Sequence, residues 1–323
     1  MTIEEKLNSI RQTKEDIKTS LRNKGIEISD TDPFSNYPIK IDGIGSGEMN
    51  VEEYFDTEHR ISSGSNQGGD WANCVQKLPA LKCTTGTSLN YAFYKYNGTT
   101  LDLSLFDTSN VVNLAYVFNN CSNLLELNLS SFNTEKVTTM SNLFNNCKKL
   151  QKINISSFNT QNTNTMASMF SNCRELKEID VSKFNTEKVT SFVNMFYYCM
   201  LLTELNLSSF KTPLVTTMGS MFYYCNALES LDLSTFATPK LTNVSSMFYM
   251  CRNLKHIDMR NFDFTNVTSY SLMFGNSAGD SIPNSCEIIV KDETAKTWLT
   301  SKFTRLTNVK TVEEYELEQA SGE

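Results

Sequence analysis

The chain has 323 residues, of which 40% are hydrophobic and 20% are charged, and its formal net charge is −7. A chain of this size and composition can bury a long hydrophobic core. With a negative net charge, the chain lacks the excess of basic residues that attracts nucleic acid, so nucleic-acid binding is not expected. The sequence contains no run of 18 apolar residues and its first 25 residues lack an apolar segment, so we expect neither a membrane span nor a signal peptide.

The first predicted element is a helix within residues 1–24. Its apolar positions recur with the 4-3 spacing of a heptad and are Ile3, Leu7, Ile10, Ile17 and Leu21, while polar Lys14 occupies one heptad slot. This pattern predicts a short coiled coil or docking helix that assembles the protein, with a homotrimer as the expected form. Gly25 is expected to end the helix, and the glycine-rich residues 43–47 are expected to form a hinge.

A repeat of 26 residues fills the middle of the chain. Phenylalanine recurs at Phe106, Phe132, Phe158, Phe184, Phe210, Phe236 and Phe262, and cysteine recurs at Cys121, Cys147, Cys173, Cys199, Cys225 and Cys251. Such strict phasing predicts stacked, nearly identical units. We therefore predict an N-terminal attachment module at 1–47, a junction and cap at 48–100, seven coils at 101–276, and a C-terminal cap at 277–323.

Each repeat contains two different periodicities. Leu127 and Leu129 alternate with polar residues, which predicts a half-buried strand within residues 124–130. The next apolar residues, Met140, Leu143, Phe144 and Cys147, follow the i, i+3, i+4, i+7 spacing of a short helix. The predicted fold is therefore an α/β solenoid of the leucine-rich-repeat type, with parallel strands and short helices, preceded by the N-terminal helical module.

The repeated cysteines are expected to form a buried column of free thiols. The nine cysteines are an odd number, which argues against an obligatory disulfide framework, and no cysteine or histidine cluster has the spacing of a metal site. No metal or cofactor is expected. In the C-terminal unit Trp298 and Phe303 are expected to cover the last coil, and the acidic end from residue 313 is expected to fray.

Two resemblances extend this interpretation. The repeat pattern L-x-L-S-x-F-x-T-x-x-V-x-x-M-x-x-M-F-x-x-C-x-x-L and the tail CEIIVKDETAKTWLTSKFTRLTNVKTV resemble the repeats and closing segment of BspA-like bacterial leucine-rich surface proteins and mycoplasma lipoproteins, over residues 78–312. This resemblance implies a recognition or adhesion scaffold without catalysis. Residues 7–44, LNSIRQTKEDIKTSLRNKGIEISDTDPFSNYPIKIDGI, resemble the N-terminal module of phage tail and appendage proteins. That second resemblance implies attachment to other virion proteins.

Two sets of polar or aromatic residues are candidates for ligand binding. The first set follows the strand positions as a ladder of Asn and Asp, and its candidate members are Asp180, Asn206, Asp232 and Asp258. The polar side chains of this ladder either keep the exposed face of the sheet hydrated or contact a ligand. A pair of these carboxylates that cleaves a sugar bond is the weaker alternative. No nucleophile–histidine arrangement or phosphate-binding loop is present, so an enzyme is not expected.

The second set lies in the two positions before each cysteine. These positions hold Asn or Ser in the earlier repeats and change to Tyr197, Tyr198, Tyr223, Tyr224 and Tyr249 in the later ones. Because they fall off the apolar stripe, the tyrosines are expected on the outside, where they suit sugar stacking or protein hot spots, although packing is an equal alternative. We expect a virion appendage that binds a host surface glycan or protein, or alternatively a BspA-like adhesin or interaction scaffold at a bacterial cell surface.

Overall fold

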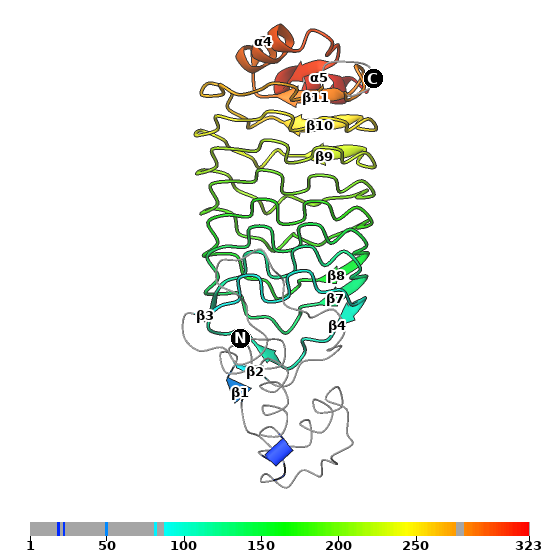
Figure 1. The fold of residues 1–323 in the computed structure, drawn as a ribbon. Helices are drawn as coiled ribbons and strands as arrows, with labels where there is room; N and C mark the ends of the chain where they lie inside the picture. The colour runs from blue at the N-terminus through cyan, green and yellow to red at the C-terminus, as the bar shows by residue number, and fades with distance from the viewer. Residues whose placement is uncertain are drawn as a thin grey trace.

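The computed structural model describes residues 87–275 and 281–322, together with isolated positions at 18, 19, 22, 49, 50, 81 and 82. In these ranges the chain winds into a column of stacked coils, and the helices α4 (Glu293–Lys302) and α5 (Val312–Ser321) lie at its C-terminal end (Figure 1). The predicted heptad residues Ile3, Leu7, Ile10, Ile17 and Leu21 lie outside the described residues.

Short parallel strands stack along one side of the column. One sheet has the order β4 (Thr100–Leu101), β7 (Glu126–Asn128) and β8 (Lys152–Asn154), and a second has the order β12 (Val309–Thr311), β11 (Glu287–Val290), β10 (His256–Met259) and β9 (Ser230–Asp232). The remaining strands are β1 (Met49–Asn50), β2 (Leu81–Lys82), β3 (Thr87–Ser88), β5 (Phe106–Asp107) and β6 (Val111–Asn113). All of these pairings are parallel, as the repeat predicted.

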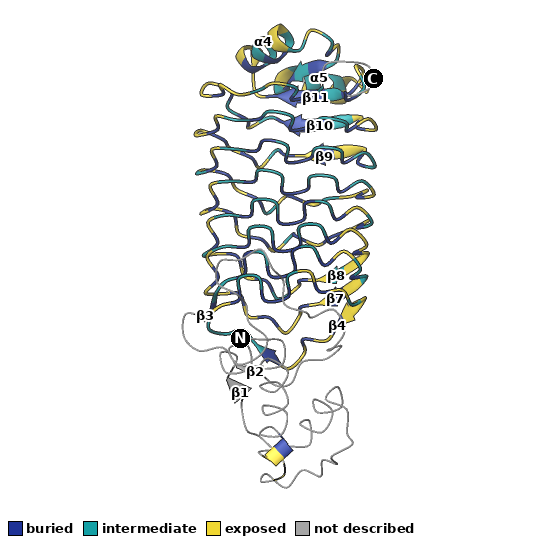
Figure 2. Ribbon diagram, viewed as in Figure 1, coloured by how far each residue is buried: buried dark blue, intermediate teal, exposed yellow. Residues whose placement is uncertain are grey.

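Strands β7 and β9 bury one face and expose the other, whereas β10 and β11, next to the C-terminal helices, are buried on both faces. In β7 Leu127 points into the core, whereas Glu126 and Asn128 on either side are exposed. Equivalent residues pair across coils, so that Glu126 lies opposite Lys152 and Leu127 opposite Ile153. Figure 2 shows the resulting exposed strand face along β4, β7 and β8. The predicted alternation is confirmed, because a strand places successive side chains on opposite faces of the sheet.

The predicted short helices are absent from the described coils, and stacked turns take their place. Between Met140 and Cys147 the N–H of Leu143 donates to the carbonyl of Met140 at 3.3 Å, which is the i to i+3 bond of a turn. Asn142 and Asn146 have φ of 57° and 63°, in the left-handed region that an α-helix excludes. The helix prediction was therefore wrong for these segments.

The neighbouring coils explain why turns form instead of helices. The N–H of Asn142 donates to the carbonyl of Ala167 at 2.8 Å, and the N–H of Asn146 donates to that of Ser171 at 2.8 Å, both in the next coil. An eight-residue helix would gain few internal bonds, whereas stacked turns satisfy their donors in the coil above. The apolar spacing still identified the core correctly, since Met140, Leu143, Phe144 and Cys147 are all fully buried.

Columns of identical side chains fill the core. Phe144 stacks on Phe118 at 5.6 Å and on Phe170 at 5.5 Å between ring centroids, and similar stacking continues to Phe274. The cysteines of the repeats are buried and free, as predicted. Each column thiol donates to a phenylalanine carbonyl of the preceding coil, for example Cys147 to Phe118 at 3.1 Å. Burial raises the pKa of the Cys199 thiol to about 12.

Aromatic residues of the C-terminal unit cover the last coil, as predicted. The Trp298 ring of α4 stacks on Phe264 at 4.7 Å, and the Phe303 ring meets Phe274 edge-on at 5.1 Å. Both Trp298 and Phe303 are partly buried against the main core. These contacts cap the open end that a stacked column would otherwise expose.

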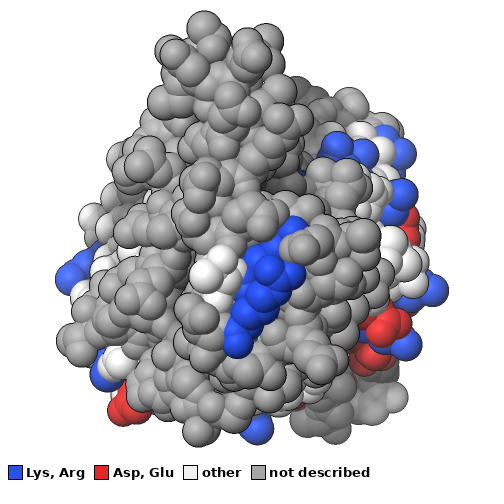
Figure 3. All heavy atoms as spheres, turned by 60° about the horizontal axis from the view of Figure 1, so that its bottom comes forward, with Lys and Arg blue, Asp and Glu red and all other residues white. Residues whose placement is uncertain are grey.

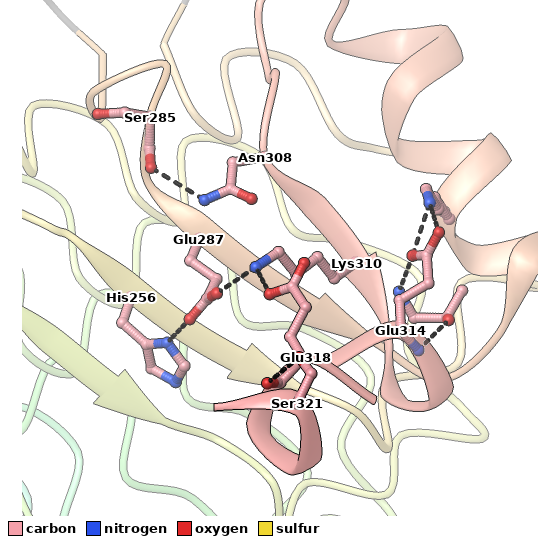
Figure 4. Close-up of polar contacts among 10 residues, drawn as sticks. His256, Ser285, Glu287, Asn308, Lys310, Glu314, Glu318 and Ser321 are labelled. Atoms are coloured by element: carbon pink, nitrogen blue, oxygen red, sulfur yellow. Dashed lines mark hydrogen bonds and ion pairs between the residues drawn. The ribbon is translucent and has the colours of Figure 1, made fainter. Parts of the chain in front are cut away.

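The acidic end does not fray, contrary to the sequence expectation, but forms α5. Thr311 and Glu314 make a reciprocal capping box at its N-terminus. Lys310 of β12 pairs with Glu287 at 2.8 Å and with Glu318 of α5 (Figure 4). The glutamates therefore hold the helix against basic residues of the cap, an arrangement that the one-dimensional charge pattern did not reveal.

Candidate functional site

The tyrosines of the later coils form two adjoining stacks, which we call the tyrosine ladder: Tyr197, Tyr198, Tyr223, Tyr224 and Tyr249. Tyr197 stacks on Tyr223 at 4.7 Å and Tyr223 on Tyr249 at 4.7 Å. In the adjoining column Tyr198 stacks on Tyr224 at 4.8 Å, with the ring planes 10° apart. All five side chains are half-buried rather than fully exposed. The structure thus brings these five candidate residues together.

Two members of the ladder have an unusual backbone. Tyr198 and Tyr224 have φ of 57° and 62°, a conformation that a bulky side chain rarely adopts. The same phase in earlier coils is occupied by Asn146 and Asn172, with φ of 63° and 60°. Asparagine tolerates this conformation and tyrosine disfavours it, so the backbone of the coil does not demand tyrosine here.

Ring stacking limits what the tyrosine ladder offers to a partner. A ring between two others, such as Tyr223, has both faces covered by Tyr197 and Tyr249 and presents only its edge and hydroxyl. Burial and, to a smaller extent, the neighbouring tyrosines raise the pKa of Tyr223 to about 12. Its hydroxyl therefore remains protonated and able to donate a hydrogen bond at neutral pH. Sugar stacking on a ring face is therefore possible only at the ends of the ladder.

One cation lies at the N-terminal end of the tyrosine ladder. The Arg174 guanidinium lies over the Tyr198 ring, 5.5 Å from its centroid, and donates to Asn172 Oδ1 at 3.2 Å. This distance is that of a cation–π contact, in which the positive charge is attracted by the electron-rich face of the ring. Tyr198 thus contacts Arg174 as well as Tyr224, and its ring also meets that of Tyr197 at 4.7 Å with the planes 50° apart.

A second tyrosine cluster, which the sequence interpretation missed, lies in the first described coils. Tyr91 stacks on Tyr116 at 4.6 Å and meets Tyr94 edge-on at 5.3 Å, and Lys95 lies over the Tyr94 ring at 5.0 Å. The N–H of Lys95 donates to the carbonyl of Asn119 in the next coil at 2.9 Å, as the N–H of Asn120 donates to that of Asn145 at 2.8 Å. Tyr91 precedes Tyr116 by 25 residues, the same spacing at which the repeat pattern survives as Leu89, Phe93 and Tyr96, so the signal for this pair was present in the sequence.

The Asn/Asp ladder has a structural use. In Asp180, Asn206 and Asp232 the side-chain Oδ1 accepts the backbone N–H two residues later, at 2.9 to 3.1 Å. This contact is an Asx turn, which ends the strand at each coil. Hydrogen bonds from Ser182 lower the pKa of Asp180. Asp258 is 6% exposed and makes a bidentate pair with Arg260. A ligand-binding role for these four residues stays a prediction.

A buried threonine ladder also escaped the sequence interpretation. Its members are Thr108, Thr134, Thr160, Thr186, Thr212 and Thr238, each buried and each two residues after a repeat phenylalanine. Thr134, for example, donates to the carbonyl of Asn159 at 2.9 Å and accepts the Asn159 N–H at 2.7 Å. The sequence signal was a threonine at the same position of each repeat. The structure explains this signal, because each of these hydroxyls is buried between two coils.

Other kinds of site find no support in the described part of the chain. Within residues 87–275 and 281–322 no group of three His, Cys, Asp or Glu side chains is placed to hold a metal ion. The helices there are too short and too polar to cross a membrane. Seen from the lower end of Figure 1, one continuous group of Lys and Arg atoms lies near the middle of the view, and smaller groups of both charge signs lie around the rim (Figure 3).

These observations define a parallel-strand repeat solenoid with few helices, a class that presents an extended surface for contact. The chain matches the family described as Mycoplasma protein of unknown function, DUF285, over residues 87–199 and 166–283. Because the matches together cover more than half of the chain, the protein belongs to the DUF285 family, which confirms the BspA-like resemblance of its repeats. No curated protein matches the chain. Both matches begin after residue 47, so the resemblance of the N-terminal segment to phage proteins stays a prediction.

Proposed function

We propose that the protein is a non-catalytic recognition scaffold of a bacterial cell surface, and that the tyrosine ladder contacts its ligand. The observation that carries this proposal is the presence of Tyr198 and Tyr224 at a backbone conformation that tyrosine disfavours. Earlier coils carry asparagine at this position and make the same backbone hydrogen bond to the next coil, from the Asn146 N–H to Ser171 at 2.8 Å and from the Tyr198 N–H to Tyr223 at 2.7 Å. A residue that is costly for the backbone and unnecessary for stacking is best explained by a contact outside the chain, where tyrosine is a frequent hot-spot residue.

The carboxylates of the strand face offer no support for catalysis. A glycosidase needs one carboxyl group with a raised pKa to act as the proton donor. The hydrogen bonds from Ser182 instead lower the pKa of Asp180, and the carboxyl of Asp232 accepts the Ser234 N–H at 2.9 Å. These groups serve the turns of the solenoid, so we assign no catalytic residue.

A virion appendage is the second candidate, and the pattern of residues 7–44 is the observation that favours it. In that case the N-terminal module would bind other virion proteins and the same tyrosine ladder would contact the host. Antibody against the coils distinguishes the two locations in electron microscopy, because it labels intact bacterial cells in the first case and purified particles in the second. The family membership favours the bacterial location.

The ligand contact is tested with the double variant Tyr198→Asn and Tyr224→Asn, which installs the residue found at this phase in Asn146 and Asn172. We expect binding of the labelled protein to target cells to weaken by about thirtyfold or more, since losing even one hot-spot ring costs roughly 2 kcal/mol. The melting temperature should change little, because relief of backbone strain offsets the lost ring stacking. Tyr315→Asn, on α5, is the matched control. If the double variant binds cells as well as the wild type does, the tyrosines are packing residues and the proposal fails.

A further inference from the structure

A cleft of about 300 Å³ lies between the last coil and the segment at the end of α4. Tyr270 and Leu272 of the coil form part of one wall, and Lys302 and Arg305 of the C-terminal unit form part of the other. Within the described part of the chain, Lys302 and Arg305 are the only charged side chains that line the cleft. The cleft is therefore positively charged.

The last coil contributes backbone donors that earlier coils use for stacking. One repeat earlier, the N–H groups of Val244 and Ser246 each donate to a carbonyl of the next coil at 2.8 Å. Tyr270 and Leu272 occupy the same two positions in the last coil, but their N–H groups have no acceptor among the described residues. Both residues are half-buried and line the cleft. Backbone N–H groups left open in a turn form a concavity that favours anions.

Leu272 is an unusual residue for its position. Its φ is 57°, and the same position in earlier coils holds Asn142 and Asn194, each also with φ of 57°. Leucine disfavours this left-handed conformation, which asparagine tolerates. The leucine side chain also has no polar atom that could accept a hydrogen bond in place of the missing next coil. The end of the stack therefore keeps its open backbone donors.

The two cations of the opposite wall have no carboxylate partner among the described residues. Arg305 Nη1 donates to Ser281 Oγ at 2.5 Å, and Arg305 Nη2 donates to Asn284 Oδ1 at 2.9 Å. These neutral acceptors fix the guanidinium in place without neutralising its charge. The Lys302 ammonium lies over the Tyr270 ring, 5.5 Å from its centroid. Both positive charges are thus held at the cleft and remain available to an anion.

We propose that this cleft binds an oxyanion group, a phosphate or a carboxylate, of a small ligand. Guanidinium and ammonium groups make strong, charge-assisted hydrogen bonds to such groups, and Arg305 keeps N–H donors that Ser281 and Asn284 do not use. The N–H groups of Tyr270 and Leu272 add neutral donors from the other wall. The inference goes beyond the proposed function, because the cleft is a different surface from the tyrosine ladder.

Binding is tested by calorimetric titration of the full chain with inorganic phosphate, glucose 6-phosphate and glucuronate, with glucose as the neutral reference. We expect at least one of the anions to bind about tenfold more tightly than glucose, and its affinity to fall as salt is added. Binding of the phosphates without glucuronate would identify a phosphate site, and the reverse result a carboxylate site. The proposal is overturned if no anion binds more tightly than glucose.

A matched pair of variants places the site in the cleft. Leu272→Asp and Leu272→Asn both install a residue that tolerates positive φ, but only the aspartate adds a negative charge. We expect the aspartate variant to lose at least about tenfold in affinity relative to the asparagine variant. Equal affinities of the two folded variants, checked by their melting temperatures, would reject this location.

The contribution of the lysine is tested with Lys302→Gln, which should weaken anion binding by about tenfold. Lys291→Gln removes the same charge from another exposed position of the C-terminal unit and is the matched control. Equal losses would show a general effect of net charge and would contradict the site. The double variant of the tyrosine ladder should bind the anion as the wild type does, so failure of this inference and failure of the proposed function are distinguishable.

Discussion

The hydroxyl of Thr160 makes two hydrogen bonds to one residue of the next coil: it donates to the carbonyl of Asn185 at 2.8 Å and accepts the N–H of Asn185 at 2.8 Å. Thr160 is 1% exposed. At this corner of the coil the threonine hydroxyl therefore takes the place of a backbone hydrogen bond between neighbouring coils. The same reciprocal pairing, 25 residues apart, recurs at Thr108, Thr134 and Thr186, while Thr212 makes only the donated bond, to the carbonyl of Ala237 at 2.7 Å.

Replacing Thr160 with valine tests this role. The shape is kept, but the carbonyl and N–H of Asn185 lose their buried partner, so we expect the free energy of unfolding to fall by about 1–3 kcal/mol. Thr190→Val is the matched control, because the exposed Thr190 hydroxyl only donates to Asn164 at 3.2 Å. Chemical denaturation of both variants checks the difference, and equal losses would show that the ladder contributes no special stability.

The buried thiols should be inert in the folded protein. Burial raises the pKa of Cys199 and Cys251 to about 12, so the reactive thiolate is scarce at pH 8. We expect a thiol-specific reagent to modify the repeat cysteines only after denaturation. A variant with Cys74→Ser and Cys83→Ser removes the two cysteines that lie outside the described residues. A reductant should leave the melting temperature unchanged, and a clear drop would contradict the free-thiol column.

Acid should loosen the C-terminal cap. Hydrogen bonds from Lys296 and from the Thr311 backbone lower the pKa of Glu314, and those from Lys310 and His256 outweigh burial and lower that of Glu287. A lowered carboxyl pKa stabilises the fold above the unfolded pKa of about 4.3, and the stabilisation is lost as pH falls through the folded pKa. Calorimetry from pH 6 to pH 3 should therefore show a falling melting temperature.

The variant Glu314→Gln isolates this contribution. It removes the titrating group, so its melting temperature should be lower than that of the wild type at pH 6 and should converge with it near pH 3. Glu313→Gln, in the same helical turn and exposed, is the matched control and should follow the wild-type curve. Parallel curves for Glu314→Gln and the wild type would show that this glutamate does not carry the acid sensitivity.

The heptad pattern of the N-terminal segment predicts assembly. Ile10→Asp together with Ile17→Asp would place charge in the expected seam, so light scattering should detect a smaller species whose coils still melt as in the wild type. A wild-type protein that is already monomeric would rule out self-trimerisation. The helix would then be assigned to docking on another protein.

The 26-residue period determined much of the fold. The position within the repeat was enough to identify Phe144 and Cys147 as core residues and Leu127 as an inward-facing residue of a parallel strand. All three residues are buried. Period and burial are coupled because residues at one phase of a solenoid stack on one another and share one environment. The switch from Asn146 to Tyr198 at constant phase was equally visible in the sequence, and it located the candidate surface.

Only the tertiary structure decided how the backbone and the rings are arranged. The apolar spacing from Met140 to Cys147 fits a helix, but the neighbouring coils accept the alternate N–H groups and favour turns with left-handed Asn142 and Asn146. The acidic end, which its composition predicted to fray, folds as α5 because Lys296 and Lys310 lie beside its glutamates. Hydrogen-bond partners and counter-charges that come from other coils leave no local pattern, so they became visible only when the coils were stacked.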